Sequence, residues 1–189
     1  MNKAVFLDRD GVINKLVLNP KTGEYESPHE VKDLELIPNV LLPVKTLYDC
    51  GYHLFVVSNQ PSFAKGKTTL ENIKKIHLGL QKMIEDRGII ITEYYYCYHH
   101  PLGIVPEYSG ECDCRKPKPF FINKAKEDYD IDLSQSWMIG DQDSDVEFGK
   151  AAGVKTIMIR NEHSRKKRGS SSPDYSVDNL SESINLILK

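Results

Sequence analysis

Short apolar runs rich in β-branched and aromatic residues recur along this chain and alternate with stretches of helical spacing. The runs typical of buried strands are AVFL at 4–7, LFVVS at 54–58, YYYCY at 94–98, WMIG at 137–140 and VKTIMI at 154–159. Helical spacing of apolar residues marks 39–50, 70–84, 120–129, 143–152 and 180–188. Strands that alternate with helices favour one parallel sheet covered on both faces. The sequence therefore predicts an α/β, three-layer Rossmann-like fold.

Chain length and charge narrow the organisation and the partners. At 189 residues the chain has the length of one domain, so we expect residues 1–189 to form a single domain and a monomer. The 25 basic and 27 acidic residues nearly cancel, which gives no field to attract nucleic acid or an anionic membrane. No apolar stretch is long enough for a signal peptide or a membrane span, which indicates a cytoplasmic protein.

A polar segment, EHSRKKRGSSSPD at 162–174, interrupts the pattern before the last strand and helix. Its composition predicts a mobile loop. The basic run inside it, from Arg165 to Arg168, is most simply a solvated surface, and contact with an anionic substrate is the alternative. Cys50 stands alone at a helix end, and we interpret it as a core residue.

Two acids follow the first predicted strand. Asp8 ends the apolar run, and Asp10 follows two residues later with Gly11 to turn the chain. Open α/β sheets place their sites at the carboxyl ends of strands, and alternating side chains let both acids share a divalent cation. A capped turn is one alternative. A calcium loop is another, but its twelfth position counted from Asp8 is Asn19, where glutamate is required.

Polar residues also follow two later strands. Ser58 and Asn59 follow LFVV, and their side chains can donate hydrogen bonds to phosphate oxygens. Asp141 and Asp145 follow WMIG and offer oxygen ligands for a hard cation, although an Asp-rich turn can also cap the next helix. Together with Lys116, these strand ends predict a site that handles a phosphoryl group.

The motifs DRDGVIN, SNQ, CRKP and GDxxxD, in this order, resemble the four motifs of the haloacid dehalogenase (HAD) superfamily of aspartyl-phosphate enzymes. The resemblance spans most of the chain. It implies an HAD fold in which Asp8 attacks phosphorus and Asp10 acts as general acid, then as general base. It also implies a phosphoric monoester hydrolase with a small-molecule substrate and catalytic Mg²⁺. The interval from Ser58 to Lys116 leaves no room for a large cap domain.

The site residues that the resemblance implies fall into two groups. The magnesium ligands are the side chains of Asp8 and Asp141 and the backbone carbonyl of Asp10. The substrate-binding residues are Ser58, Asn59, Gln60, Lys65, Arg115 and Lys116.

Three of the four cysteines gather at 97–114. Cys97, Cys112 and Cys114, together with one histidine, match the ligand types of tetrahedral zinc. In an extended chain, residues that are two positions apart point to the same side, so the two ligands of each closely spaced pair can face one metal ion. Four protein ligands leave no open position, so this Zn²⁺ would be structural. His99 and His100 both fit the spacing, and the resembling family uses Cys-x-His, which favours His99. The metal would then hold Arg115 and Lys116, the next two residues, over the site. Small buried thiols without metal are the alternative.

Within the superfamily, the segment CYHHPLGIVPEYSGECDCRKP resembles the zinc-containing heptose bisphosphate phosphatases, which serve nucleotide-activated heptose biosynthesis and lipopolysaccharide. The implied substrate is D-glycero-D-manno-heptose 1,7-bisphosphate, which loses its 7-phosphate. The chain departs from that family at Lys65, where arginine is usual, and at Phe120 and Gln142. Alternatives are a histidinol-phosphate phosphatase, a polynucleotide 3'-phosphatase, and a zinc-stabilised binding module without activity.

Overall fold

A six-stranded parallel sheet forms the centre of the protein. The computed structural model describes all residues, 1–189. The strands lie in the order β5-β4-β1-β6-β7-β8, and every neighbouring pair is parallel. Their bounds are β1 Ala4–Leu7, β4 His53–Asn59, β5 Glu93–Cys97, β6 Trp137–Gly140, β7 Lys155–Ile159 and β8 Tyr175–Val177.

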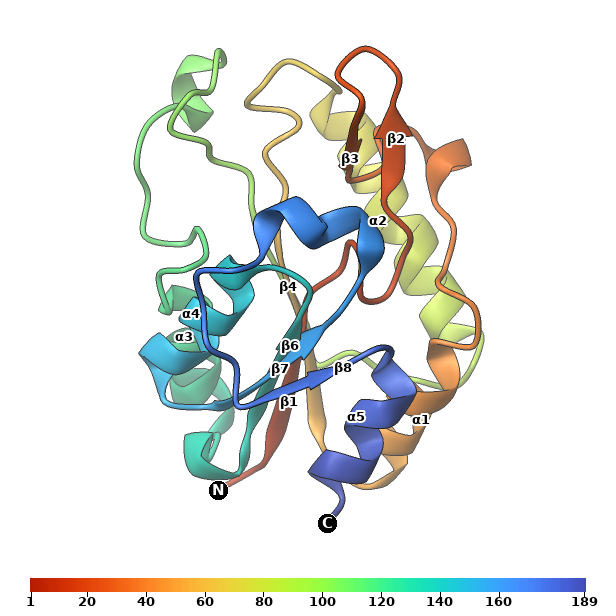
Figure 1. Ribbon diagram of the computed structural model, residues 1–189, viewed down its shortest axis with the longest axis vertical. Helices are drawn as coiled ribbons and strands as arrows, with labels where there is room; N and C mark the ends of the chain where they lie inside the picture. Colours follow the sequence, from red (N-terminus) through yellow and green to blue (C-terminus); the bar gives the residue numbers. More distant parts are fainter.

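Helices cover both faces of this sheet (Figure 1). One face packs against α1 (Leu41–Asp49), α2 (Leu70–Glu85) and α5 (Leu180–Ile187), and the other against α3 (Phe120–Tyr129) and α4 (Asp143–Ala152). The predicted three-layer α/β fold is confirmed. No cap domain is inserted between the elements, as the sequence also predicted.

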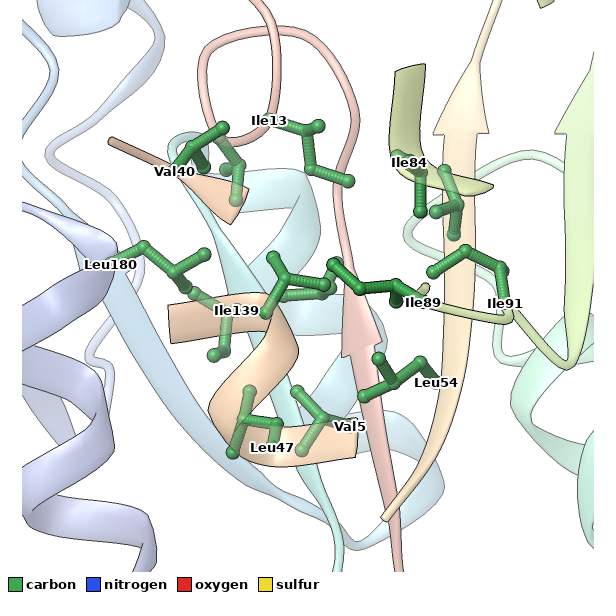
Figure 2. Close-up of a cluster of buried hydrophobic side chains, with 14 of the residues drawn as sticks. Val5, Ile13, Val40, Leu47, Leu54, Ile84, Ile89, Ile91, Ile139 and Leu180 are labelled. Atoms are coloured by element: carbon green, nitrogen blue, oxygen red, sulfur yellow. The ribbon is translucent and has the colours of Figure 1, made fainter. Parts of the chain in front are cut away.

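The alternation of side chains along β1 divides the core in two. Val5 and Leu7 belong to the cluster under α1, α2 and α5, whereas Ala4 and Phe6 belong to the cluster under α3 and α4. Figure 2 shows the first cluster, to which Leu47 of α1 and Leu180 of α5 contribute. Because β1 is buried on both faces, all four of its residues are apolar.

A hairpin and four short 3₁₀ helices lie outside the main layers. The hairpin joins β2 (Val17–Asn19) to β3 (Glu24–Glu26), and the 3₁₀ helices are η1 Val31–Asp33, η2 Pro106–Tyr108, η3 Leu133–Gln135 and η4 Glu162–Lys167. The hairpin, the loop around η2 and the segment around η4 all lie beyond one end of the sheet, opposite the two termini (Figure 1).

Two expectations from the sequence differ from the structure. The segment 162–174 was expected to be a mobile loop, but it begins with η4, which Asn161 caps by accepting from the His163 amide. Cys50 was interpreted as a core residue, but it is exposed at the end of α1. None of the helices is both long and apolar enough to cross a bilayer.

Candidate active site

The acids and hydroxyl predicted from the strand ends come together at the carboxyl end of the sheet. Asp8 and Asp10 follow β1, Ser58 lies near the end of β4, and Asp141 follows β6. All four are buried, with exposed fractions of 5% or less. The parallel register brings these three neighbouring strand ends to one point, which explains why residues 133 positions apart along the chain share one site.

Lys116 is the buried cation at the centre of this group. Its ammonium lies 2.8 Å from Asp8 Oδ1 and 2.6 Å from Asp145 Oδ1, and it donates to the Val57 carbonyl at 2.8 Å. Burial acts to lower the pKa of Lys116, but the two carboxylates outweigh it and raise that pKa above its ordinary value. Lys116 therefore carries its charge toward Asp8.

Asp145 holds the site together instead of offering a free ligand. Besides pairing with Lys116, it accepts from the amides of Asp141 (3.2 Å) and Gln142 (3.0 Å) through Oδ2. Both of its oxygens are thus occupied, and its contact with the Gln142 amide caps α4, which is the alternative to a cation ligand that the sequence offered. Gly140 makes this arrangement possible, since a Cβ there would lie 2.1 Å from the Cβ of Asp145.

Asp141 differs from Asp145 in that its carboxylate has no partner in the protein. Both of its carboxylate oxygens are buried and lack a hydrogen-bond partner. Burial, together with the charges of Asp8 and Asp145, raises the pKa of Asp141 well above its usual range. Burial likewise raises the pKa of Asp8 to about 6, against the opposing effect of Lys116. Four buried carboxylates, Asp8, Asp10, Asp141 and Asp145, face only two buried cations, Arg9 and Lys116.

Gly11 turns the chain directly after the two acids. Its φ of +92° lies in the region that favours glycine, and a Cβ at this position would meet Asp141 Oδ2 at 2.1 Å. The Gly11 carbonyl accepts from Asn161 Nδ2 at 3.0 Å, which ties the loop after β1 to the segment around η4.

The residues of SNQ do not all face the pocket. Ser58 and Asn59 line the pocket above the acids, as predicted. Asn59 also fixes Lys116, because its side chain accepts from the Lys116 amide (3.1 Å) and donates to the Lys116 carbonyl (3.2 Å). Gln60 is 1% exposed and is absent from the pocket lining, so it binds Asp10 and Ser58 from behind instead of facing a substrate.

The pocket has a volume of about 340 Å³, and above its floor four cations outnumber two acids, Glu24 and Glu26, of which Glu26 is paired with Lys67. Its floor holds the buried acids and Lys116, and its outer cations are Lys65, Lys67, Arg115 and Lys167. Burial, and after it the charges of Lys67 and Arg115, lowers the pKa of Lys65, against the opposing effect of Glu26. Lys65 and Arg115 were predicted here, whereas Lys167 belongs to the run that we had interpreted as a solvated surface.

Two segments distant in sequence meet at the pocket. Tyr25 of the β2–β3 hairpin lines it and stacks on the ring of His163 in η4, with ring centroids 3.8 Å apart. Ser164 anchors η4 by donating to the Asp141 carbonyl at 3.0 Å, and Asp143 accepts hydrogen bonds from Ser170 and Ser171. These contacts place Lys167 at the pocket.

A second cluster, of cysteine and histidine side chains, lies beside the pocket. Cys97, His99, Cys112 and Cys114 offer ligand atoms that all lie within 4.8 Å of one another. Sγ of Cys112 lies 3.5 Å from that of Cys97 and 3.6 Å from that of Cys114, and His99 Nδ1 lies 3.9 and 3.7 Å from the same two thiols. A tetrahedron around zinc with Zn–S bonds of about 2.3 Å has edges of about 3.8 Å. The cluster therefore has the size of a metal site, and it selects His99 over His100.

The Cys/His cluster is connected to the basic residues that follow it. Arg115 donates to the His99 carbonyl at 3.1 Å, and Lys116 comes directly after Arg115. Burial, more than any other cause, raises the pKa of the Cys97 thiol above its ordinary value, so deprotonation of this thiol in the folded protein requires a compensating charge.

Comparison with known proteins agrees with this geometry. A family model described as HAD-hydrolase-like matches residues 113–183. D-glycero-α-D-manno-heptose-1,7-bisphosphate 7-phosphatase of Photorhabdus laumondii is 33% identical over 162 residues, which cover 85% of this chain and 84% of the relative. D-glycero-β-D-manno-heptose-1,7-bisphosphate 7-phosphatase of Haemophilus ducreyi is 34% identical over 180 residues, which cover 94% of this chain and 94% of the relative. The chain belongs to the HAD-like hydrolase family. It is a hydrolase, and the two relatives described here are named as phosphatases.

Solved structures place this HAD-like hydrolase in the same fold. The D,D-heptose 1,7-bisphosphate phosphatase of B. bronchiseptica, solved with magnesium and phosphate, superposes with a TM-score of 0.81 at 22% identity and covers 98% of each chain. A HAD phosphatase from Thermococcus onnurineus superposes with a TM-score of 0.64 at 18% identity, covering 98% of this chain and 97% of the other. At these identities the likeness establishes the fold.

Several residues of the pocket were missed by the sequence interpretation. Tyr25 and Lys67 line it, yet they lie in polar segments without a recognisable pattern, whereas Lys167 belongs to the basic run for which contact with an anionic substrate was only the alternative. Arg9, behind the pocket, was also missed. The sequence did offer a signal for it, because Arg9 stands between two acids, and a buried cation requires a carboxylate as its counterion.

Proposed function

We propose that this enzyme is a phosphomonoesterase that removes the 7-phosphate of D-glycero-D-manno-heptose 1,7-bisphosphate through a phosphoryl-aspartate at Asp8. The observation that carries the proposal is the two-part pocket, which has buried acids and Lys116 at its floor and, above them, four cations that outnumber Glu24 and Glu26. Such a pocket suits a substrate with a phosphate at each end. The relatives named above act on heptose 1,7-bisphosphate, which supports this choice.

The floor of the pocket supports the proposed chemistry. Asp8 would attack phosphorus as Asp10 gives a proton to the leaving sugar oxygen. Asp10 would then take a proton from the water that displaces phosphate from Asp8. Lys116, 2.8 Å from Asp8 Oδ1, would neutralise charge on the transferring phosphoryl group, with Ser58 and Asn59 as hydrogen-bond donors. General acid-base catalysis of this kind contributes about 10²- to 10⁴-fold.

The same floor fits a divalent cation. The two partnerless oxygens of Asp141 are buried beside Asp8, and the excess of buried carboxylates over cations calls for added positive charge. We propose Asp8 and Asp141 by side chain, and Asp10 by its backbone carbonyl, as ligands of Mg²⁺. When bound, the ion supplies electrostatic stabilisation of the charge on the phosphoryl group.

A substrate comparison tests the proposed function. We expect the bisphosphate, assayed as both anomers, to have a higher kcat/KM than heptose 7-phosphate or histidinol phosphate, because the outer cations position the second phosphate. Lys65→Ala and Arg115→Ala should each reduce the preference for the bisphosphate by about tenfold, the value of one charge-assisted hydrogen bond. The measurement is kcat/KM for each substrate, side by side.

Lys74→Ala serves as the matched control, because Lys74 is an exposed lysine on α2 outside the pocket. It should leave the preference unchanged. Equal kcat/KM for mono- and bisphosphate, or a clear preference for histidinol phosphate, would exclude the heptose substrate and leave the phosphatase chemistry in place. Release of 3'-phosphate from DNA ends at a higher kcat/KM would favour the polynucleotide alternative.

Magnesium binding should depend on pH through the buried acids. The raised pKa of Asp8, about 6, means that protons compete with the ion for this carboxylate below that pH. We therefore expect Mg²⁺ to raise the melting temperature more at about pH 7.5 than at about pH 5. Asp141→Asn should abolish most of the Mg²⁺-dependent rise. A rise of equal size at both pH values would contradict the assignment.

The remaining proposals concern the Cys/His cluster and the state of the chain. We propose that the cluster at 97–114 holds a structural Zn²⁺, supported by its four ligand atoms at tetrahedral spacing.

We also propose that residues 1–189 act as a single-domain monomer in the cytoplasm. The pocket is built within one chain, and the free thiols suit a reducing compartment.

A further inference from the structure

Arg9, between the two acids of the site, is completely buried, with an exposed fraction of 0%. Its guanidinium donates from Nε to Asp10 Oδ1 (3.1 Å) and from Nη2 to Oδ1 (2.9 Å) and Oδ2 (3.1 Å). Burial alone would lower the pKa of Arg9, but the adjacent Asp10 carboxylate raises it above the ordinary value. A buried guanidinium is stable only when its charge is paired, so Arg9 and Asp10 form one unit.

Two further side chains keep the guanidinium in place. Gln60 accepts from Arg9 Nη2 at 2.8 Å and donates to Asp10 Oδ2 at 2.6 Å, so it joins both members of the pair. The ring of Tyr96 lies against Arg9, with its centroid 5.6 Å from the guanidinium carbon. The fork of Arg9 is therefore fixed from behind, on the side away from the pocket, whose lining does not include Arg9.

These contacts also fix how Asp10 faces the pocket. Oδ1 is occupied by Arg9 and by Asn14 Nδ2 at 2.9 Å, and Oδ2 is occupied by Arg9 and Gln60. The longest contact of the carboxylate is with the Ser58 hydroxyl, at 3.5 Å from Oδ2, and Ser58 and Asp10 both line the pocket. On the side of Oδ2 that faces Ser58, the carboxylate has only this one long contact, and a reacting water or leaving oxygen can take that position.

We propose that Arg9 is a positioning residue that holds the Asp10 carboxylate with Oδ2 toward the reacting oxygen. The inference rests on the acid-base role of Asp10 in the proposed function. In the hydrolytic step, the water oxygen bonds to phosphorus, the bond from phosphorus to the Asp8 oxygen breaks, and the proton of the water passes to Asp10 Oδ2. Without Arg9, Asp10 keeps its place in the chain but loses the fork that sets its orientation.

Burst kinetics with p-nitrophenyl phosphate separate the two half-reactions. p-Nitrophenolate leaves without needing a proton, so phosphorylation of Asp8 should proceed normally in Arg9→Met. Hydrolysis of the phosphoryl-aspartate still needs Asp10 and should slow by at least about tenfold, part of the 10²- to 10⁴-fold that a positioned base contributes. We expect a burst of p-nitrophenolate equal to the amount of folded enzyme, followed by this slow phase. Arg9→Lys should fall between, because lysine keeps the charge but lacks the fork.

The control is Tyr95→Leu, which removes the neighbouring ring of β5 that packs on the opposite face of the sheet, against Phe55 and Phe121 and away from Arg9. It should lower the melting temperature without slowing the steady rate per burst site. A steady rate per burst site that is unchanged in Arg9→Met would overturn the positioning role. If Arg9→Met does not fold, Arg9→Lys decides: a slow phase supports the proposal, and wild-type kinetics contradict it.

Asp10→Asn distinguishes failure of this inference from failure of the proposed function. If Asp10→Asn shows the burst and slow phase but the Arg9 variants behave as wild type, only the role of Arg9 is wrong. If Asp10→Asn turns over at the wild-type rate, the acid-base role of Asp10 is wrong, and the inference about Arg9 fails with it.

Discussion

Replacing Asp8 with asparagine is expected to lower kcat by about 10⁴-fold or more, because the amide cannot accept the phosphoryl group. The protein should remain folded. Burial raises the pKa of Asp8 to about 6, above its value in an unfolded chain, so stability is lost as the pH rises through 6 and the carboxyl ionises. Asparagine removes that ionisation, and the metal-free variant should be at least as stable as wild type at about pH 7.5. Phosphate release with saturating Mg²⁺, together with thermal melting, measures both effects.

Asp86→Asn is the matched control for this prediction. It makes the same change from acid to amide at the end of α2, where Asp86 pairs with Lys82 on the surface. Because surface ion pairs contribute about 0–1 kcal/mol, turnover should be unchanged and the melting temperature nearly so. Near-native turnover by Asp8→Asn would show that the phosphoryl group does not pass through Asp8.

The sheet was predictable because its strands are buried on both faces. In β1, β6 and most of β4, nearly every residue must be apolar, which leaves a continuous run in the sequence. The polar residue that ends each run is then a marked position. Asp8, Ser58 and Asp141 could be brought together on this basis, since parallel strands end at one edge of the sheet.

The parts above the pocket could not be predicted in this way. The β2–β3 hairpin has two strands of three residues each, none of them buried, so it leaves no periodic pattern. The segment around η4 is ordered by contacts with distant residues: the ring of Tyr25, the carbonyl of Asp141 and the carboxylate of Asp143. Local composition reports none of these contacts, which is why Lys167 was interpreted as part of a solvated run.

Gln60 shows a different kind of error. Its place beside Ser58 and Asn59 in SNQ led to the prediction that it binds substrate. The structure turns its amide toward Arg9 and Asp10, because the buried Arg9–Asp10 pair needs further hydrogen-bond partners in the protein interior. The motif indicated the correct position in the fold, but the orientation of the side chain depends on a buried charge that the motif does not describe.

Cys112→Ser is expected to reduce stability and activity together. Cys112 lies between the thiols of Cys97 and Cys114, so its loss removes a ligand from the centre of the cluster. Loss of a structural metal belongs among the largest single-substitution effects, more than about 4 kcal/mol. The expected wild-type content is about one zinc per chain, measured by elemental analysis, and the variant should bind little.

The effect on activity follows from the connection between the cluster and the pocket. Arg115 donates to the carbonyl of the ligand His99, and Lys116, the next residue, bonds to Asp8. Without the metal, Arg115 loses its fixed partner at His99 and the segment that leads into Lys116 loses its support, so kcat/KM of the folded fraction should fall as well as the melting temperature. Cys50→Ser controls for thiol loss, because Cys50 is exposed and distant in sequence from the cluster, and it should change neither quantity. Metal-free protein that is fully active and equally stable would contradict the structural role of zinc, because a metal that can be removed without effect does not hold Arg115 or the segment that leads into Lys116.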